Sequence, residues 1–188
     1  METKNAILLL ADGAEEMETV TTVDILRRAG IVVTIASITD SMTIKCSRDI
    51  KIVADCKLDD VQDQDYDVVI LPGGLGGSKA LGASEKVGKL LKLQENKGKI
   101  IAAICAAPTA LKSHGIFKNK QLTSYPAMKD QLTDFYQYLE DDVVIDGNLI
   151  TSRGPGTVYS FALAIVEKLL GKSAALPVAQ GMLYKNYQ

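Results

Sequence analysis

The sequence predicts an α/β fold of the doubly wound kind, with a mostly parallel sheet sandwiched by helices in a single domain. Two observations predict it. Apolar runs of strand length recur along the chain, and they are continuous rather than alternating, as expected when both faces of a parallel sheet are covered. Helical stretches separate the runs. The runs are residues 6–10, 32–38, 68–71 and 99–104.

The first strand leads into the first helix. Residues 6–10 are too few to span a bilayer, and acidic residues follow them instead of a small-residue cleavage site. We expect a helix over residues 15–29, with Gly30 as its stop. Three apolar residues of this helix are expected on one shared face, namely Val20, Val23 and Leu26.

The middle of the chain supplies a hairpin and a second helix. Over residues 43–53 the apolar pattern loosens, which indicates a short hairpin or an edge ribbon. Residues 84–96 form an amphipathic helix that ends before Gly98. Its apolar face carries Val87, Leu90 and Leu91.

The C-terminal part is expected to contain a strand pair and two helical segments. Residues 143–146 and 149–151 flank a glycine-asparagine pair, whose turn chemistry favours a tight reversal between strands. The Gly-Pro-Gly-Thr motif at 154–157 opens a helix that ends at Gly171. A final short segment, residues 174–182, packs either on the body of the protein or on a partner.

Composition favours one globular protein with small-molecule or protein partners. The 188 residues suit a single domain, which we expect to span residues 1–188. A net charge of -2 gives no reason to expect a nucleic-acid or membrane partner. Cys46, Cys56 and Cys105 include no CxxC pair and no metal-ligand spacing, so we expect no disulfide framework and no metal. A cytoplasmic location fits best, and fractions in mitochondria and the nucleus are left open.

Three features are expected at one edge of the sheet, beyond the carboxyl ends of the strands, where ligands bind in open parallel sheets. They are residues 12–18, the Pro72-Gly73-Gly74 turn and Cys105. Cys105 stands where an apolar strand runs into a helix, and a helix N-terminus favours the thiolate and makes the sulfur more nucleophilic. A buried, inert cysteine is the alternative, and the motif by itself leaves both open.

Three glutamates lie in the first turn of the expected helix: Glu15, Glu16 and Glu18. For Glu15 and Glu16 we favour an interaction with the helix dipole alone. Glu18 is expected near the margin of the buried face, where partial desolvation raises the pKa of its carboxyl. It would then stay protonated and donate a hydrogen bond to a thiolate.

The glycines and the single histidine are weaker candidates. Gly73-Gly74 forms either a simple tight turn or a turn that aims an amide at an oxyanion. The glycine-rich segment fits neither phosphate-binding fingerprint, so nucleotide binding is excluded. His114 lies on the order of 13 Å from Cys105 along a helix. We therefore expect it to cap that helix before Gly115 rather than to act as a base.

Two arginines lie in or beside irregular segments of the chain. Arg48 comes after Cys46 and Ser47, and Arg153 precedes the turn at residues 154–157. Either side chain could hold an anion or a carboxylate by a fork of hydrogen bonds. The sequence alone favours a solvated surface position for both.

Together these motifs resemble the ThiJ/PfpI family, and the resemblance covers essentially the whole chain. Matching segments occur in order at residues 13–19, 27–30, 46–49, 71–74, 102–106 and 151–157. The resemblance implies a flavodoxin-like sandwich that needs no cofactor and forms a homodimer. It also implies that Cys105 is the nucleophile and the peroxide-sensitive thiol, that Glu18 is protonated and hydrogen-bonded to it, and that the amides of Gly74 and Ala106 form an anion site.

The resemblance also implies a dimer contact and a pocket. The dimer contact involves Glu15, Met17, Arg27, Arg28 and Arg48. We place Tyr125 and Pro155 with Arg48 around the pocket. Relatives commonly have a histidine where this chain has Tyr125, and a tyrosine hydroxyl does not titrate near neutrality as imidazole does. Glu18 is then the sole acid and base.

Three functions follow from this set of residues. The first is a cofactor-free enzyme acting on dicarbonyls such as methylglyoxal, free or added to protein or nucleotide groups, in which Cys105 attacks the aldehyde. The second is a non-catalytic redox sensor or chaperone, in which Cys105 is oxidised to a sulfinate that Glu18 hydrogen-bonds. The third is a cysteine hydrolase or peptidase, which is disfavoured because a peptide bond needs a leaving-group acid.

Overall fold

The computed structural model describes residues 3–187. They form a central seven-stranded sheet in the order β10-β11-β7-β6-β1-β2-β5. Every neighbouring pair is parallel except β10 with β11, which are antiparallel. The strands are β1 (Asn5–Leu10), β2 (Val32–Ser37), β5 (Cys56–Lys57), β6 (Val68–Leu71), β7 (Ile100–Ile104), β10 (Val143–Asp146) and β11 (Leu149–Ser152). This confirms the predicted mostly parallel, single-domain sheet.

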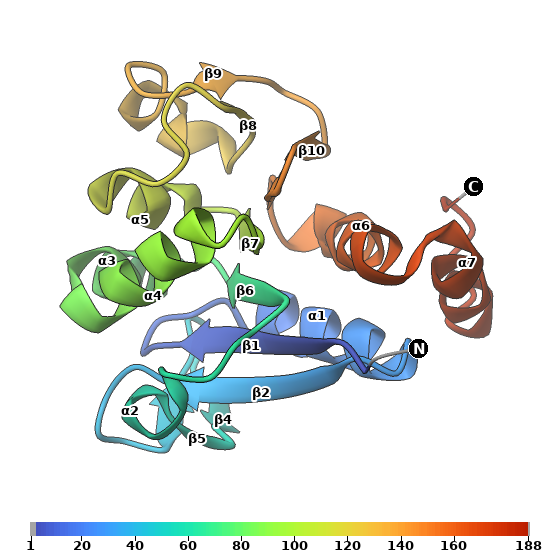
Figure 1. The fold of residues 1–188 in the computed structure, drawn as a ribbon, viewed down its shortest axis with the longest axis horizontal. Helices are drawn as coiled ribbons and strands as arrows, with labels where there is room; N and C mark the ends of the chain where they lie inside the picture. The colour runs from blue at the N-terminus through green and yellow to red at the C-terminus, as the bar shows by residue number, and fades with distance from the viewer. Residues whose placement is uncertain (1–2, 188) are drawn as a thin grey trace.

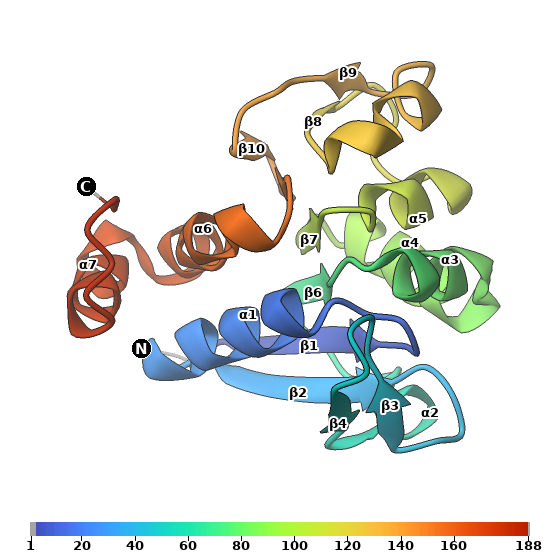
Figure 2. The same ribbon diagram turned by 180° about the vertical axis from the view of Figure 1, so that it is seen from behind.

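Helices cover both faces of the sheet, as Figures 1 and 2 show from opposite sides. One face packs against α1 (Glu16–Arg28) and α6 (Val158–Leu170), and α7 (Lys172–Gly181) packs against α6 in the same core. The other packs against α2 (Leu58–Val61), α3 (Leu75–Ala83), α4 (Glu85–Asn96) and α5 (Pro108–Ser113). Strand β1 shows why the run is continuous, because its alternate residues enter two different cores. Leu8 belongs to the first core and Leu9 to the second.

Shorter elements complete the chain. The predicted hairpin is β3 (Thr43–Lys45) with β4 (Lys51–Val53), paired antiparallel. A two-stranded parallel sheet joins β8 (Gln121–Leu122) to β9 (Gln137–Tyr138), and two 3-10 helices are η1 (Pro126–Gln131) and η2 (Pro155–Thr157). None of the helices in the described residues is long and apolar enough to cross a membrane.

The first helix differs from the prediction at one position. Val23 and Leu26 are buried as expected, but the side chain of Val20 is 55% exposed. The buried face instead carries Thr19, Thr22 and Glu18. The apolar spacing therefore predicted the wrong buried face for the first turns of α1. At this end of the helix the buried side chains are polar, and Val20 is exposed.

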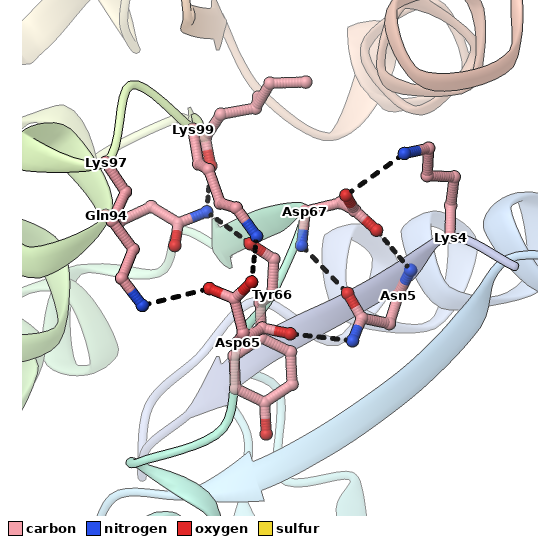
Figure 3. A network of polar contacts seen from close by, with 9 residues as sticks. Lys4, Asn5, Asp65, Tyr66, Asp67, Gln94, Lys97 and Lys99 are labelled. Carbon is pink, nitrogen blue, oxygen red and sulfur yellow. Dashed lines mark hydrogen bonds and ion pairs between the residues drawn. The ribbon is translucent and has the colours of Figure 1, made fainter. Parts of the chain in front are cut away.

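A polar network fixes the starts of three parallel strands at the opposite edge of the sheet (Figure 3). Asn5 and Asp67 exchange two hydrogen bonds, each donating its backbone amide to the other's side chain at 2.9 Å. The buried amide of Gln94 donates to the carbonyls of Tyr66 and Ile100 at 3.1 and 3.0 Å. Because a slip by one residue would break these bonds, the network sets the register in which β1, β6 and β7 reach the other edge.

Candidate active site

Cys105 lies directly after β7 in a backbone conformation that side chains rarely adopt, with φ of 63°. Its main chain is held on both sides. The amide donates to the carbonyl of Ser152 at 3.0 Å, and the carbonyl accepts from the amide of Tyr125 at 2.8 Å. Such strain persists only where the surroundings fix it, and it is concentrated at functional sites.

Glu18 lies in the first turn of α1, fully buried beneath this cysteine. One carboxyl oxygen, Oε2, accepts the amide of Gly73 at 2.7 Å. The other, Oε1, is buried and has no hydrogen-bond partner by geometry among residues 3–187. A Cβ atom on Gly73 would stand 2.5 Å from both Glu18 Oε2 and Cys105 Cβ, so only glycine fits between them.

The carboxyl and the thiol affect each other's ionisation. Burial raises the pKa of Glu18 to about 7, although the Gly73 amide and the Cys105 thiol act in the opposite direction. Burial and the Glu18 charge raise the pKa of Cys105 to about 12. Below pH 7 the pair therefore holds two protons, and above pH 7 it holds one proton and one negative charge between two adjacent groups.

This result corrects the sequence prediction for the sulfur. We expected a helix N-terminus to lower the pKa of the Cys105 thiol, but that pKa is raised. The helix α5 begins only at Pro108 and is six residues long. Burial outweighs the dipole of so short a helix, and the proton must instead be taken up by Glu18. The raised pKa predicted for Glu18 is in the right direction.

Two backbone amides stabilise negative charge at the sulfur. The backbone amides of Gly74 and Ala106 both favour negative charge on the Cys105 sulfur and lower the pKa of its thiol. Gly74 has φ of 83°, and a side chain there would overlap the backbone of the loop at residues 13–15. The glycine pair therefore does aim an amide at the reactive atom, which was one of the two predicted alternatives.

The sulfur lies on the wall of a cavity of about 720 Å³. Several predicted residues meet there. The cavity is lined by Gly13, Glu15, Arg48, Gly74, Cys105, Ala106, Tyr125 and Pro155, together with residues not predicted for the pocket, Lys45, Cys46, Ser47, Asp49, Leu75, Gly76, Ala127 and Met128. Residues 45–49 belong to the predicted hairpin, whereas nothing in the sequence pattern marks Met128. Part of the cavity is thus formed by residues that the sequence predicted, and the rest by residues such as Met128 that no local sequence motif marks.

The hairpin turn is fastened to the start of α1. The hydroxyl of Ser47 donates to Glu15 Oε2 at 2.6 Å and to Glu16 Oε2 at 2.8 Å, and the amide of Arg48 donates to Glu16 Oε1 at 2.8 Å. These bonds contradict our prediction that Glu15 and Glu16 only complement the helix dipole. They hold the exposed Arg48 at the rim of the cavity.

Other predicted residues lie elsewhere. Met17 is 56% exposed on α1. Arg27 pairs with Asp55 at 3.1 Å and Arg28 with Asp24 at 2.6 Å. None of these three lines the cavity. Arg153 is not a freely solvated side chain, because its guanidinium donates to the carbonyl of Glu140 at 2.6 Å.

The histidine and the remaining cysteines agree with the sequence analysis. His114 is the C-terminal cap of α5, and its Nε2 lies 2.9 Å from the carbonyl oxygen of Leu81. It does not line the cavity. Cys46 is buried, Cys56 is half-buried, and all three cysteines are free.

Comparison with known proteins defines the class of this protein. The model of the DJ-1/PfpI family matches residues 4–168. The chain is 56% identical over 181 residues to the protein dj-1beta of Drosophila melanogaster, covering 96% of this chain and 97% of that one. The crystal structure of Drosophila melanogaster DJ-1beta aligns with a TM-score of 0.95, covering 97% of this chain and 98% of that one at 56% identity.

A further relative carries an enzymatic name. The chain is 44% identical over 170 residues to the glutathione-independent glyoxalase DJR-1.2 of Caenorhabditis elegans, covering 89% of this chain and 90% of that protein. The chain belongs to the DJ-1/PfpI family. The family match confirms the resemblance stated from the sequence.

Proposed function

We propose that this chain is a cofactor-free glyoxalase and deglycase, with Cys105 as the nucleophile and Glu18 as the acid and base. The observation that carries the proposal is the arrangement of three groups: the Cys105 thiol on the wall of one cavity, the Gly74 and Ala106 amides beside it on that wall, and behind them the fully buried Glu18 carboxyl, whose pKa is raised to about 7. The thiol and the carboxyl can exchange a proton, and the amides can stabilise negative charge. Addition of a thiol to a carbonyl requires both. The glyoxalase name of the Caenorhabditis elegans relative adds support.

The first step joins the sulfur to the aldehyde carbon of methylglyoxal. Glu18 takes the thiol proton as the carbon–sulfur bond forms, and the carbonyl electrons move onto the aldehyde oxygen. We assign the amides of Gly74 and Ala106 to stabilise that oxyanion, because both already favour negative charge on the adjacent sulfur. Return of the proton from Glu18 gives a neutral hemithioacetal. A thiol adds readily to so electrophilic an aldehyde, so this modest machinery suffices.

The next steps rearrange the adduct to lactate. Glu18 removes the hydrogen on the former aldehyde carbon, an enediol forms, and the proton returns to the neighbouring carbon to give a lactoyl thioester. Water then attacks the thioester, releasing lactate and restoring the thiol. Methylglyoxal and one water are consumed for each lactate. In the deglycase reaction the sulfur displaces an amine from its dicarbonyl adduct, and Glu18 supplies the proton that the leaving amine needs.

Lactate formation from methylglyoxal tests this function. We expect Cys105→Ser and Glu18→Ala each to lower turnover by about 10²-fold or more, because one removes the nucleophile and the other its proton acceptor. Cys56→Ser is the matched control and retains the wild-type rate, since Cys56 lies outside the cavity. Lactate is measured directly in the same assay. Full turnover by either active-site variant would refute the proposal.

We also propose that Cys105 protects against oxidants by becoming a sulfinate. Cys105 and Cys46 both line the cavity, but Cys105 is half-buried whereas Cys46 is only 3% exposed. Burial raises the thiol pKa of both residues, to about 11 for Cys46 and about 12 for Cys105, but only Cys105 has backbone amides that favour its thiolate. Two molecules of hydrogen peroxide would convert the Cys105 thiol to the sulfinic acid and two waters. A protonated Glu18 can donate a hydrogen bond to the sulfinate from its unpartnered oxygen.

Mass spectrometry after mild peroxide treatment tests the oxidation. We expect two oxygens to be added at Cys105 before either other cysteine is modified, because Cys105 is more exposed than Cys46 and, unlike Cys56, it lines the cavity and adjoins a carboxyl that takes up its proton. Peptide mapping assigns the site. Earlier modification of Cys46 or Cys56 would contradict this second role.

The exposed apolar side chains of α1 and of the hairpin support a homodimer. Met17, Val20, Ile50 and Val53 are each more than half exposed. The bonds from Ser47 and Arg48 to Glu15 and Glu16 fasten the hairpin turn to the start of α1, and we propose that the four side chains share one face. A surface of this kind is typical of a protein interface, and we propose that a second copy of the chain covers it.

The molar mass in solution tests the dimer. Light scattering should give twice the mass of one chain for the wild type. Met17→Lys should shift the mass toward one chain, because it buries a charge at the contact. Ile145→Lys changes an apolar side chain of similar exposure on β10 and should keep the dimer mass. A wild-type mass equal to one chain would sink the proposal.

A further inference from the structure

A second cavity of about 420 Å³ adjoins the active-site cavity, between α3, α5 and η1. The two cavities have three wall residues in common, namely Leu75, Ala106 and Met128. Ala106 directly follows Cys105, and its amide favours negative charge on the sulfur. The second cavity therefore begins one residue from the reacting atom, and the proposed reaction with methylglyoxal gives it no role.

Two closely packed helices form the walls. A Cβ atom on Gly82 of α3 would lie 3.2 Å from Ser113 Oγ and 3.4 Å from Ala110 Cα of α5. The helices thus touch at this end, and the space between them opens toward η1. Walls made by packed helices keep a binding group in a fixed position better than loops do.

The wall has one charged side chain and no carboxylate. This side chain is Lys79, which is exposed on α3. Within the residues that the structure describes, Lys79 has no ion-pair partner, whereas the nearby Lys86 and Lys112 pair with Asp59 and Asp134. The second cavity is therefore suited to a negatively charged group.

A buried hydroxyl beside this lysine also has no partner. Ser78 lines the same cavity and is 3% exposed, and its Oγ has no hydrogen bond in the described part of the chain. The other wall hydroxyls are satisfied, because Thr109 donates to the carbonyl of Ala106 at 2.7 Å and Ser113 to that of Thr109 at 3.1 Å. Buried hydroxyls without partners are rare in proteins, so the Ser78 hydroxyl is left with a hydrogen bond to donate.

We infer that the second cavity binds the anionic tail of a dicarbonyl substrate, a carboxylate or a phosphate, while the aldehyde of the same molecule reacts at Cys105. The inference rests on the proposed function. Methylglyoxal has only a methyl group in place of a tail, so it leaves this cavity unused. The substrate class is 2-oxoaldehydes that carry an acidic group, with Lys79 and Ser78 as the residues that select them.

Matched pairs of substrates test the subsite. One pair is 4,5-dioxopentanoate and its methyl ester, and the other is hydroxypyruvaldehyde phosphate and hydroxypyruvaldehyde. In Lys79→Met we expect the KM for the anionic member to rise about fivefold, the effect of losing one partly exposed charge pair. The kcat for both members and the KM for the neutral member should not change. Lys79→Arg should keep the wild-type KM for the anionic member. Lys89→Met, on the exposed face of α4, is the control lysine and changes neither member.

The two pairs also distinguish the sources of the charge. A response of the carboxylate pair alone assigns the tail as a carboxylate, and a response of the phosphate pair alone assigns it as a phosphate. Equal changes for charged and neutral members, or no change in either pair, would overturn the inference.

A binding measurement separates this inference from the proposed function. Calorimetry on Cys105→Ser with 4,5-dioxopentanoate and its ester needs no turnover. If the acid binds more tightly than the ester, and Lys79→Met removes that difference, the subsite is supported. This holds even if the wild type makes no lactate from methylglyoxal and the proposed function fails. Equal binding of acid and ester overturns the subsite and leaves the methylglyoxal reaction untouched.

Discussion

The burial of the Glu18 carboxyl against the Cys105 thiol is the interaction on which the rest of the site depends. A buried carboxylate is costly unless it finds partners, and here only one oxygen has a backbone donor, the amide of Gly73. The cost appears as a raised pKa of about 7. That cost is useful, because a carboxyl poised near neutrality can both take and return a proton. The sulfur, kept protonated by burial, depends on that exchange to react.

Three elements from distant parts of the chain must meet for this contact to form. Glu18 comes from the first turn of α1, Gly73 from the end of β6 and Cys105 from the end of β7. The parallel sheet brings the strand ends to one edge, and the network around Asn5 and Asp67 sets their register from the other edge. The absence of a side chain at Gly73 then lets the three touch. The requirement for glycine at position 73 is thus tied to the proton exchange between Glu18 and Cys105.

The sequence was sufficient for what depends on local patterns. Continuous apolar runs predicted β1, β2, β6 and β7, and turn chemistry predicted the reversal between β10 and β11. The position of Cys105 after a buried strand and the approach of the glycine pair also followed from order along the chain. The sequence failed where burial depends on distant segments. Val20 is exposed, and the hairpin binds Glu15 and Glu16. Ser78 and Lys79 gave no periodic signal, because their cavity exists only once α3, α5 and η1 have packed.

The pH dependence of Cys105 alkylation is the most direct measurement of the shared proton. In the wild type we predict that the rate with iodoacetamide rises as pH increases through about 7, since loss of the first proton from the pair leaves a carboxylate that accepts the thiol proton. In Glu18→Gln that rise near 7 should vanish and the reaction should need a higher pH. A single rise near 9.0, the ordinary value for a thiol, in both proteins would contradict the coupling of the two groups.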